Sequence, residues 1–476
     1  MDIFNFICIL TLFLPLILGV YLIYSRLALV SVDKRILNYG NFLVNLLCFL
    51  SSGLFLASAF LNDNSVYISK MFFSLNEINI TSGILLDKTN IQFLVYSALT
   101  YTIVSLFANL YFKKKKQFLF TKQRYYIFLS LIAFNTYLFI ISSNLFQSLI
   151  LWIIQGLIIF IFSYFDLFKS TVNFNIARFT RISMLGDFAF LLGAFLLFKY
   201  AFISEGYIES VSLDFNSLNI LISYMYGIAE KIEFYISLAC FIVAFMSKLF
   251  IFPLSCYYSF FANSSNIFYA SIITASNSIL GLLLFSKLSP YFEFLNVSFH
   301  KFAIFFAICS IISALFIIFE KNIKIIFGYI VSAINSIFIA LCFVFNNELM
   351  FYAYYILNIF ILFVIMILFY KDKNNIKSAL INKKTGFLLE RTHICVFETI
   401  PSKIFDLFNF IDEKLFQNIV PVFVKLLSLL SMIFVIKAGK QSKYTRIKSI
   451  FIIFALFAII AIFIAFFGRY NAVFTK

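Results

Sequence analysis

The feature that most constrains this chain is a series of long apolar stretches that contain few or no charged residues. Each stretch is about twenty residues long, and a helix of that length, at about 1.5 Å per residue, covers the roughly 30 Å hydrocarbon layer of a bilayer. A soluble domain would interrupt such a stretch every few residues with a side chain that faces water. These stretches therefore predict helices whose solvent is lipid.

About twelve such stretches occur, and each is expected to cross the membrane once. They cover residues 3–23, 42–60, 91–111, 126–142, 146–165, 176–197, 232–252, 267–284, 302–319, 325–345, 351–370 and 450–467. The first lacks the basic region and the small-residue cleavage pattern of a secretory signal, so it is interpreted as a span. A further span over 418–436 is the competing interpretation of that region. The predicted fold class is all-α, a polytopic membrane helix bundle.

Charge is concentrated in the short connections between these stretches. Of the 476 residues, 63% are hydrophobic and 12% are charged, against about 45–50% and about 25% in soluble domains. The net charge of +16 would suggest nucleic acid in a soluble protein, but here the basic residues serve as orientation signals. Odd-numbered connections are basic, as in Lys113 to Lys116, and the second and sixth are acidic. This pattern predicts an outer amino terminus, and no nucleic-acid partner is expected.

Two ionisable residues lie within predicted spans, where a charge is costly and therefore carries a functional hypothesis. Asp187 lies halfway along 176–197, and Lys248 lies late in 232–252, five residues before Pro253. A proline removes a backbone donor and frees a carbonyl about four residues earlier, and such helix breaks in transporters line cavities. A lysine beside such a cavity suits a proton relay. Alternatively, Lys248 reaches the interface and Pro253 only ends the span.

Neighbouring polar residues also have structural interpretations. Asp187 could pair with Arg178 or Arg181 on its own helix, or with a basic group on a neighbouring span. Gln155 is the strongly polar group of its span, and a buried glutamine is more often a hydrogen-bond partner between helices than a transport residue. The cysteines are scattered singly, no nucleotide-binding motif is present, and the two histidines, His300 and His393, lie near segment ends. No metal site and no cofactor are therefore predicted.

A segment after the eleventh stretch differs from the spans. Its apolar residues recur at helical spacing on one side, at Ile404, Leu407, Phe408, Ile411, Leu415, Ile419 and Val422. Acidic and amide side chains occupy the other side. This pattern predicts an amphipathic helix that lies on or beside the bundle.

The order of these features resembles the antiporter-like membrane subunits of respiratory NADH:quinone oxidoreductase (complex I), specifically subunit L, called chain 5 in mitochondria. The matching stretches are ILLDKTNIQF with Asp87, LFQSLILWIIQGLIIFIFSYF, ARFTRISMLGDFAFLLGAFLLF, FMSKLFIFPLSCYYSFF, KNIKIIFGYIVSAINSIF, IFDLFNFIDEKLF and AGKQSKY. They cover most of the chain, and their order is more specific than any one of them.

The resemblance implies five regions. These are 1–111 with three spans, 112–300 as an antiporter-like repeat with a helix broken near Pro253, 301–385 as a partial second repeat, 386–449 as the lateral helix and 450–476 as the last span.

The resemblance also implies a function. The expected function is proton translocation driven by redox-coupled conformational change, in a non-redox subunit without a cofactor of its own. Expected partners are the other membrane-arm subunits, the lipid bilayer and protons, in the mitochondrial inner membrane or the bacterial cytoplasmic membrane. The residues that match the family's motifs give Lys248, Asp187 and Lys324 as proton-transfer groups and Gln155, Thr274 and Tyr329 as polar channel candidates.

Departures from the family keep alternatives open. Gln155 stands where the family has a glutamate, and the family's histidine of the eighth span falls at Ile273 or Thr274. Several spans between Tyr370 and the lateral helix have no counterpart, so the second repeat is incomplete. The chain could instead be a scaffold subunit without transport, or a subunit of a related cation/proton antiporter complex, and the ion could be H⁺ or Na⁺. An unrelated polytopic enzyme or lipid carrier is disfavoured by the lack of clustered catalytic residues.

Overall fold

The structure is a computed structural model that describes residues 8–28, 32–62, 66–75, 78–115, 119–163, 170–203, 214–215, 218, 222, 231–255, 267–288, 292, 299–319 and 323–345. The chain divides into two compact units. One comprises residues 1–22 and 32–371 and contains nearly all of the described residues. The other comprises 23–31 and 372–476, of which only 23–28 are described.

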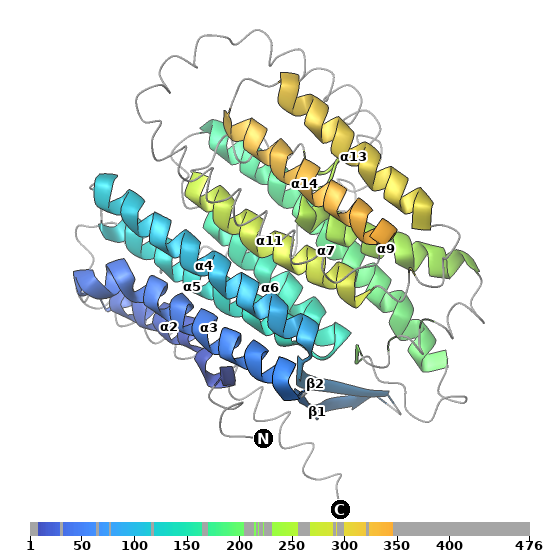
Figure 1. Cartoon of the computed structure of the whole chain (residues 1–476), viewed down its shortest axis with the longest axis horizontal. Coiled ribbons are helices and arrows are strands. Elements are labelled where there is room, and N and C mark those ends of the chain that lie inside the picture. Colours follow the sequence, from blue (N-terminus) through green and yellow to red (C-terminus); the bar gives the residue numbers. More distant parts are fainter. Residues whose placement is uncertain are drawn as a thin grey trace, which may run out of the picture. The chain divides into compact units, whose positions relative to one another are not determined.

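Long helices dominate the described part (Figure 1). They are α2 (Leu14–Leu27), α3 (Lys34–Asn62), α4 (Lys88–Lys115), α5 (Leu119–Ile141), α6 (Leu145–Ser163), α7 (Ser170–Ile203), α9 (Lys231–Leu249), α11 (Ile267–Lys287), α13 (Phe299–Phe319) and α14 (Ile323–Phe345). Each overlaps one predicted span, although the bounds differ by up to about a dozen residues, as for α2 against 3–23. Eight are long and apolar enough to cross a membrane, and shorter apolar helices cover Ile272–Lys287 and Lys301–Ile317. The all-helical polytopic membrane fold is thus confirmed. The predicted spans 351–370 and 450–467, the lateral helix and the alternative span 418–436 lie outside the described residues.

One β-hairpin interrupts the helices. Strand β1 (Val66–Leu75) pairs antiparallel with β2 (Ile78–Leu86), with a register shift between Met71 and Phe73. The acidic residues of this region predicted a connection between spans. Its β-branched and aromatic residues favour strands, and this local preference is expressed because the segment lies outside the apolar stretches.

Helix packing places α11 at the centre of the larger unit. Helix α11 contacts α4, α5, α6, α9 and α14, while α7 packs on α9 and α13 on α14 (Figure 1). All side chains from 272 to 285 are buried, including those of Thr274, Ser276 and Asn277. Outer helices have the opposite distribution, since Ile304 and Ile311 of α13 are 59% and 60% exposed. Apolar side chains outside and polar ones inside are what a lipid solvent requires.

Even-numbered connections meet at one end of this unit. Ser142, between α5 and α6, forms a β-bridge with Ile84 of the hairpin, and Asn144 forms another with Asp214. The ammonium of Lys287, at the end of α11, donates to the carbonyl of Ser142 at 2.9 Å. Alternate connections are thus on the same side, as expected when each helix crosses once. We call this the hairpin end.

Candidate functional site

The carboxyl end of α9 is a defined helix stop. Phe250 adopts a left-handed conformation with φ of 55°. The amide of Ile251 donates to the carbonyl of Met246 at 3.0 Å. This is the pattern of a Schellman cap, in which a residue with positive φ lets the chain turn back on the last helical turn. A helix that stops after 19 residues places its last turn, with Lys248, at this break.

The carbonyl of Leu249 receives a hydrogen bond from a different helix. The position of Pro253 predicts a freed carbonyl about four residues earlier, and Leu249 is the residue four positions before it. The side-chain amide of Asn335, on α14, donates to this carbonyl and also reaches the hydroxyl of Ser278 on α11. Asn335 is fully buried. The broken end of α9 is therefore tied to α14 inside the bundle.

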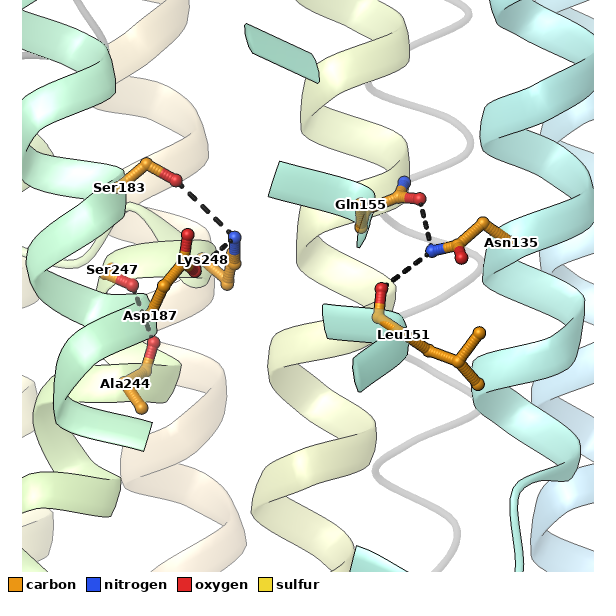
Figure 2. A network of polar contacts seen from close by, with 8 residues as sticks. All are labelled: Asn135, Leu151, Gln155, Ser183, Asp187, Ala244, Ser247 and Lys248. Atoms are coloured by element: carbon orange, nitrogen blue, oxygen red, sulfur yellow. Dashed lines mark hydrogen bonds and ion pairs between the residues drawn. The ribbon is translucent and has the colours of Figure 1, made fainter. Parts of the chain in front are cut away.

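Lys248 forms an ion pair with Asp187 across the α7 and α9 contact. Its Nζ lies 2.9 Å from Oδ1 of Asp187, and the two side chains are 1% and 19% exposed. The same Nζ lies 3.4 Å from the hydroxyl of Ser183 and 5.0 Å from the centroid of the Trp152 ring. Figure 2 shows the lysine and the aspartate turned toward each other. Lys248 therefore does not extend to the interface, which was the alternative interpretation of this residue.

Two glycines make room for this pair. A methyl group on Gly186 would overlap the hydroxyl of Ser247, so the close approach of α7 and α9 depends on the absence of a side chain there. On α6, a methyl group on Gly156 would lie 2.9 Å from Oδ2 of Asp187 and 3.7 Å from Nζ of Lys248. Helix α6 thus presents bare backbone to both charges.

An ion pair at this depth requires an explanation. A single charged side chain at the centre of a membrane costs about 2.5–3.5 kcal/mol on the insertion scale. Pairing offsets much of that cost but seldom makes a buried pair better than apolar residues of the same size. The side chains of Arg178 and Arg181, the alternative partners of Asp187, are not among those described. The pair with Lys248 is therefore the arrangement that the structure supports.

Gln155 takes part in a separate hydrogen-bond network. The amide of Asn135, on α5, donates to Oε1 of Gln155 at 2.8 Å and to the carbonyl of Leu151 at 2.9 Å. Nε2 of Gln155 reaches the hydroxyl of Thr136 at 3.5 Å, and that hydroxyl is 2.7 Å from the hydroxyl of Tyr101 on α4. Figure 2 shows the Gln155 side chain directed toward Asn135 and away from Lys248. Its geometry is that of a hydrogen-bond partner between helices.

The remaining sequence candidates lie in different surroundings. Thr274 is buried in the central helix α11. Tyr329 packs against the ring of Phe316 at 5.2 Å, in an apolar cluster that includes Phe252. Lys324 belongs to α14, and its side chain is outside the description. The structure thus brings together Lys248, Asp187 and the helix break at Pro253, whereas Tyr329 belongs to an apolar contact.

Several site residues were missed by the sequence analysis. Asn135, Asn335 and Trp152 are each at most 3% exposed and contact the site or its helices. The two asparagines had a readable signal, since each is an amide within an apolar stretch. Trp152 had none, because an aromatic residue in a span is ordinary. Within the described ranges, no three His, Cys, Asp or Glu side chains gather in a way that could hold a metal ion.

The fold defines a class: a polytopic membrane protein whose helices are arranged like those of chains from multi-subunit membrane complexes. No family model matches the sequence. The sequence is 23% identical over 267 residues to the NADH-quinone oxidoreductase subunit L of Neisseria meningitidis, from serogroups A and B alike. The alignment covers 56% of this chain and 39% of those relatives, so the chain spans well under half of their length.

Two solved structures share the fold. A chain of the membrane-bound sulfane sulfur reductase, an archaeal respiratory membrane complex, has a TM-score of 0.53 and 14% identity, with 71% of this chain and 64% of that chain covered. A chain of the Mrp complex from a Dietzia species has a TM-score of 0.54 and 14% identity, with 75% and 37% covered. At this identity the likeness concerns the fold, and the distant sequence similarity to subunit L is in line with it.

Proposed function

We propose that this chain is an ion-translocating subunit of a respiratory or antiporter-type membrane complex, with Lys248 and Asp187 as the central proton-transfer pair. The observation that carries the proposal is the ion pair of 2.9 Å, buried at the last turn of α9, which stops at Leu249. Charged residues at membrane depth commonly mark ion pathways. The relatives by sequence are subunits L of an NADH-quinone oxidoreductase, which favours H⁺ as the ion and a redox-driven complex as the assembly.

Proton transfer through this site requires a group that binds a proton and that can be separated from its counter-charge. While Lys248 is an ammonium, Asp187 neutralises it. When a conformational change separates the two, Lys248 can release its proton to water, because a lysine without a counter-charge is poorly solvated in a low-dielectric surrounding. Gly156 has no side chain that would obstruct either charge, whereas a methyl group there would lie only 2.9 Å from Oδ2 of Asp187. We infer that motion of α9 against α7 drives the release.

A neutral pair tests this proposal directly. The double substitution Lys248→Met with Asp187→Asn removes both charges and leaves neither one buried alone, so the subunit is expected to assemble. In sealed native-membrane vesicles we expect the initial rate of substrate-driven proton transport to fall by about 100-fold, the lower end of what a positioned proton-transfer group contributes. An assembled double variant with the parental rate would exclude the pair as the pathway.

A scaffold without transport is the second candidate, and Gln155 is the observation that favours it. This residue cannot titrate, and Asn135 fixes it at 2.8 Å, where the resemblance to subunit L has a glutamate. If the scaffold role is correct, the neutral pair changes neither assembly nor transport. If transport uses Asp187 in place of the missing glutamate, then Asp187→Asn blocks transport, and adding Gln155→Glu restores part of it by returning a carboxylate to α6.

The proteins that co-purify with this chain distinguish between the kinds of complex to which it could belong. We expect gentle solubilisation to bring this chain out with the other membrane-arm subunits and with redox subunits that carry flavin and iron–sulfur centres. Co-purification with other antiporter-like subunits and without redox centres would instead indicate a cation/proton antiporter complex. Isolation as a lone, active protein would exclude both.

A further inference from the structure

A second lysine, Lys287, lies at the hairpin end in surroundings unlike those of a surface residue. Its ammonium donates to the carbonyl of Ser142 at 2.9 Å and lies 3.4 Å from the hydroxyl of the same residue. The ring of Phe215 is centred 4.1 Å from Nζ and that of Phe139 6.0 Å away. Across the described residues, no carboxylate lies within ion-pair distance of this ammonium.

Two acidic groups of the hairpin end, Asp87 and Asp214, have other hydrogen-bond partners. Asp87 begins α4, and its carboxylate accepts from the amide of Asn90 at 2.6 Å, while it attracts Lys287 from a longer distance. Asp214 accepts from the hydroxyl of Tyr67 at 2.7 Å and from the amide of Asn144 at 3.4 Å. The Lys287 ammonium is held by a carbonyl and by aromatic rings, and the carboxylates are farther away. The side chain can therefore stay in place when it loses its proton, because the carbonyl also accepts a hydrogen bond from a neutral amine.

One row of α6 connects this lysine with Lys248. Ser148, Trp152 and Gly156 are four residues apart in succession, so they lie on one side of the helix at steps of about 6 Å. The hydroxyl of Ser148 is 2.7 Å from that of Ser142, the partner of Lys287. Gly156 is the residue next to Lys248 and Asp187. Trp152 therefore occupies the turn between the two lysine sites.

The turn between the sites is aromatic but contains an unsatisfied polar atom. The rings of Trp152 and Phe139 are 5.9 Å apart, and each lies near one of the two ammonium groups, at 5.0 Å from Lys248 and 6.0 Å from Lys287. Both side chains are fully buried, and Nε1 of Trp152 has no hydrogen-bond partner in the described part of the protein. Buried polar atoms of this kind are commonly satisfied by ordered water.

We propose that Lys287 is a second proton-binding residue, at the hairpin end of the pathway, and that Trp152 and Phe139 form an aromatic barrier between it and Lys248. This inference rests on the proposed function. In the transfer, an N–H bond of the Lys248 ammonium breaks and one forms at the neutral amine of Lys287, so the total charge of the two lysines is unchanged. Water carries the proton past the rings, because the two nitrogens are too far apart for a direct hydrogen bond.

The test compares three lysine variants in the assembled complex, in sealed vesicles. Lys287→Gln retains a donor for Ser142 and cannot carry a proton, and Lys287→Arg retains a charge that arginine does not release. Both are expected to lower proton transport by about 100-fold. The control is Lys199→Gln, at an exposed ion pair with Glu233, which is expected to stay within about twofold of the parent. Parental transport in either Lys287 variant overturns the proposal, since a fixed charge or a neutral donor would then suffice.

The same assay distinguishes this inference from the function on which it rests. If the neutral pair at Lys248 and Asp187 abolishes transport while Lys287→Gln does not, only the second site fails. If both leave transport unchanged, the proposed function fails as well. Trp152→Ala is expected to let an imposed proton gradient decay about tenfold faster, and an unchanged decay would remove the barrier.

Native protein provides a measurement that needs no variant. An amine-acylating reagent added to sealed vesicles is expected to modify Lys287 only from the side of the hairpin end, and to leave Lys248 unmodified, as detected by peptide mass spectrometry. Absence of Lys287 modification from both sides would show that no water path reaches this residue, and the proposal would be wrong even if every variant failed to assemble.

Discussion

Lys248 and Lys287 both lie in the last turn of a helix, but they are held by different partners. Lys248 lies 2.9 Å from a carboxylate, which stabilises only the charged form of the lysine. Lys287 lies 2.9 Å from a backbone carbonyl, which accepts a hydrogen bond from either form. The first site therefore consists of two groups that depend on each other, whereas the second holds its lysine with neutral groups. The loss of unfolding free energy on replacing each lysine measures this difference.

The largest expected effect is at the first site. Lys248→Met leaves Asp187 charged and alone, and breaking a buried pair from one side costs about 3–5 kcal/mol of unfolding free energy. Adding Asp187→Asn should recover most of this loss, because no buried charge remains. Denaturant unfolding in detergent measures both values. If the single variant is no less stable than the double one, the two charges do not depend on each other.

The close contact of α7 and α9 supports the same pair. Gly186→Ala places a methyl group against Ser247, and forcing extra volume into a packed contact costs about 1–3 kcal/mol. Gly53→Ala on α3 is the matched control, since a methyl group there meets nothing within 4 Å. The control should be neutral or slightly stabilising, because alanine favours helix over glycine. Equal unfolding free energies for the two variants would contradict this account of Gly186.

A smaller effect is expected at the second site. Lys287→Met removes the hydrogen bond to Ser142 but leaves no charge behind, so the expected loss is about 1 kcal/mol. Thermal unfolding of the purified subunit, compared with that of Lys248→Met, gives the ranking. A loss as large as that of Lys248→Met would mean that Lys287 has a charged partner after all, and the comparison between the sites would no longer hold.

The smallest effect is expected at the surface. Lys199 and Glu233 form an ion pair of 2.8 Å whose side chains are 45% and 28% exposed, and exposed pairs typically contribute about 0.2–1 kcal/mol. Lys199→Gln should therefore lower the unfolding free energy by about 0.5 kcal/mol or less. This value sets the baseline for a lysine whose pairing is not enclosed by the bundle.

The sequence was sufficient for the helices and for singling out Asp187 and Lys248, because both depend on local signals. An apolar stretch of spanning length identifies a helix wherever it occurs, and the charges of Asp187 and Lys248 are conspicuous within such stretches. A basic group on a neighbouring span was one of the partners predicted for Asp187, and Lys248 lies 2.9 Å from it. The proton-transfer roles of Lys248, Asp187 and Lys324 and the channel roles of Gln155, Thr274 and Tyr329 stay predictions.

The second site could not be read from the sequence, because it is assembled from four connections. Lys287 follows Ser286 at the end of an apolar stretch, where a lysine usually faces water or headgroups. Only the folded chain shows that the carbonyl of Ser142 and the ring of Phe215 meet it there. The hairpin escaped for a related reason, since its acidic flanks suggested a connection and its strand-forming residues carried less weight.

Helix α11 links the surroundings of Lys248 mechanically to Lys287. Ser278, within it, contacts Asn335, which holds the broken end of α9 next to Lys248. Its last residue is Lys287 itself. Hydrogen bonds along the axis make a helix stiff in that direction. A shift of α11 along its axis by about 1–2 Å, the size of known helix shifts, would therefore disturb the helix cap of α9 through Ser278 and displace Lys287 at the same time.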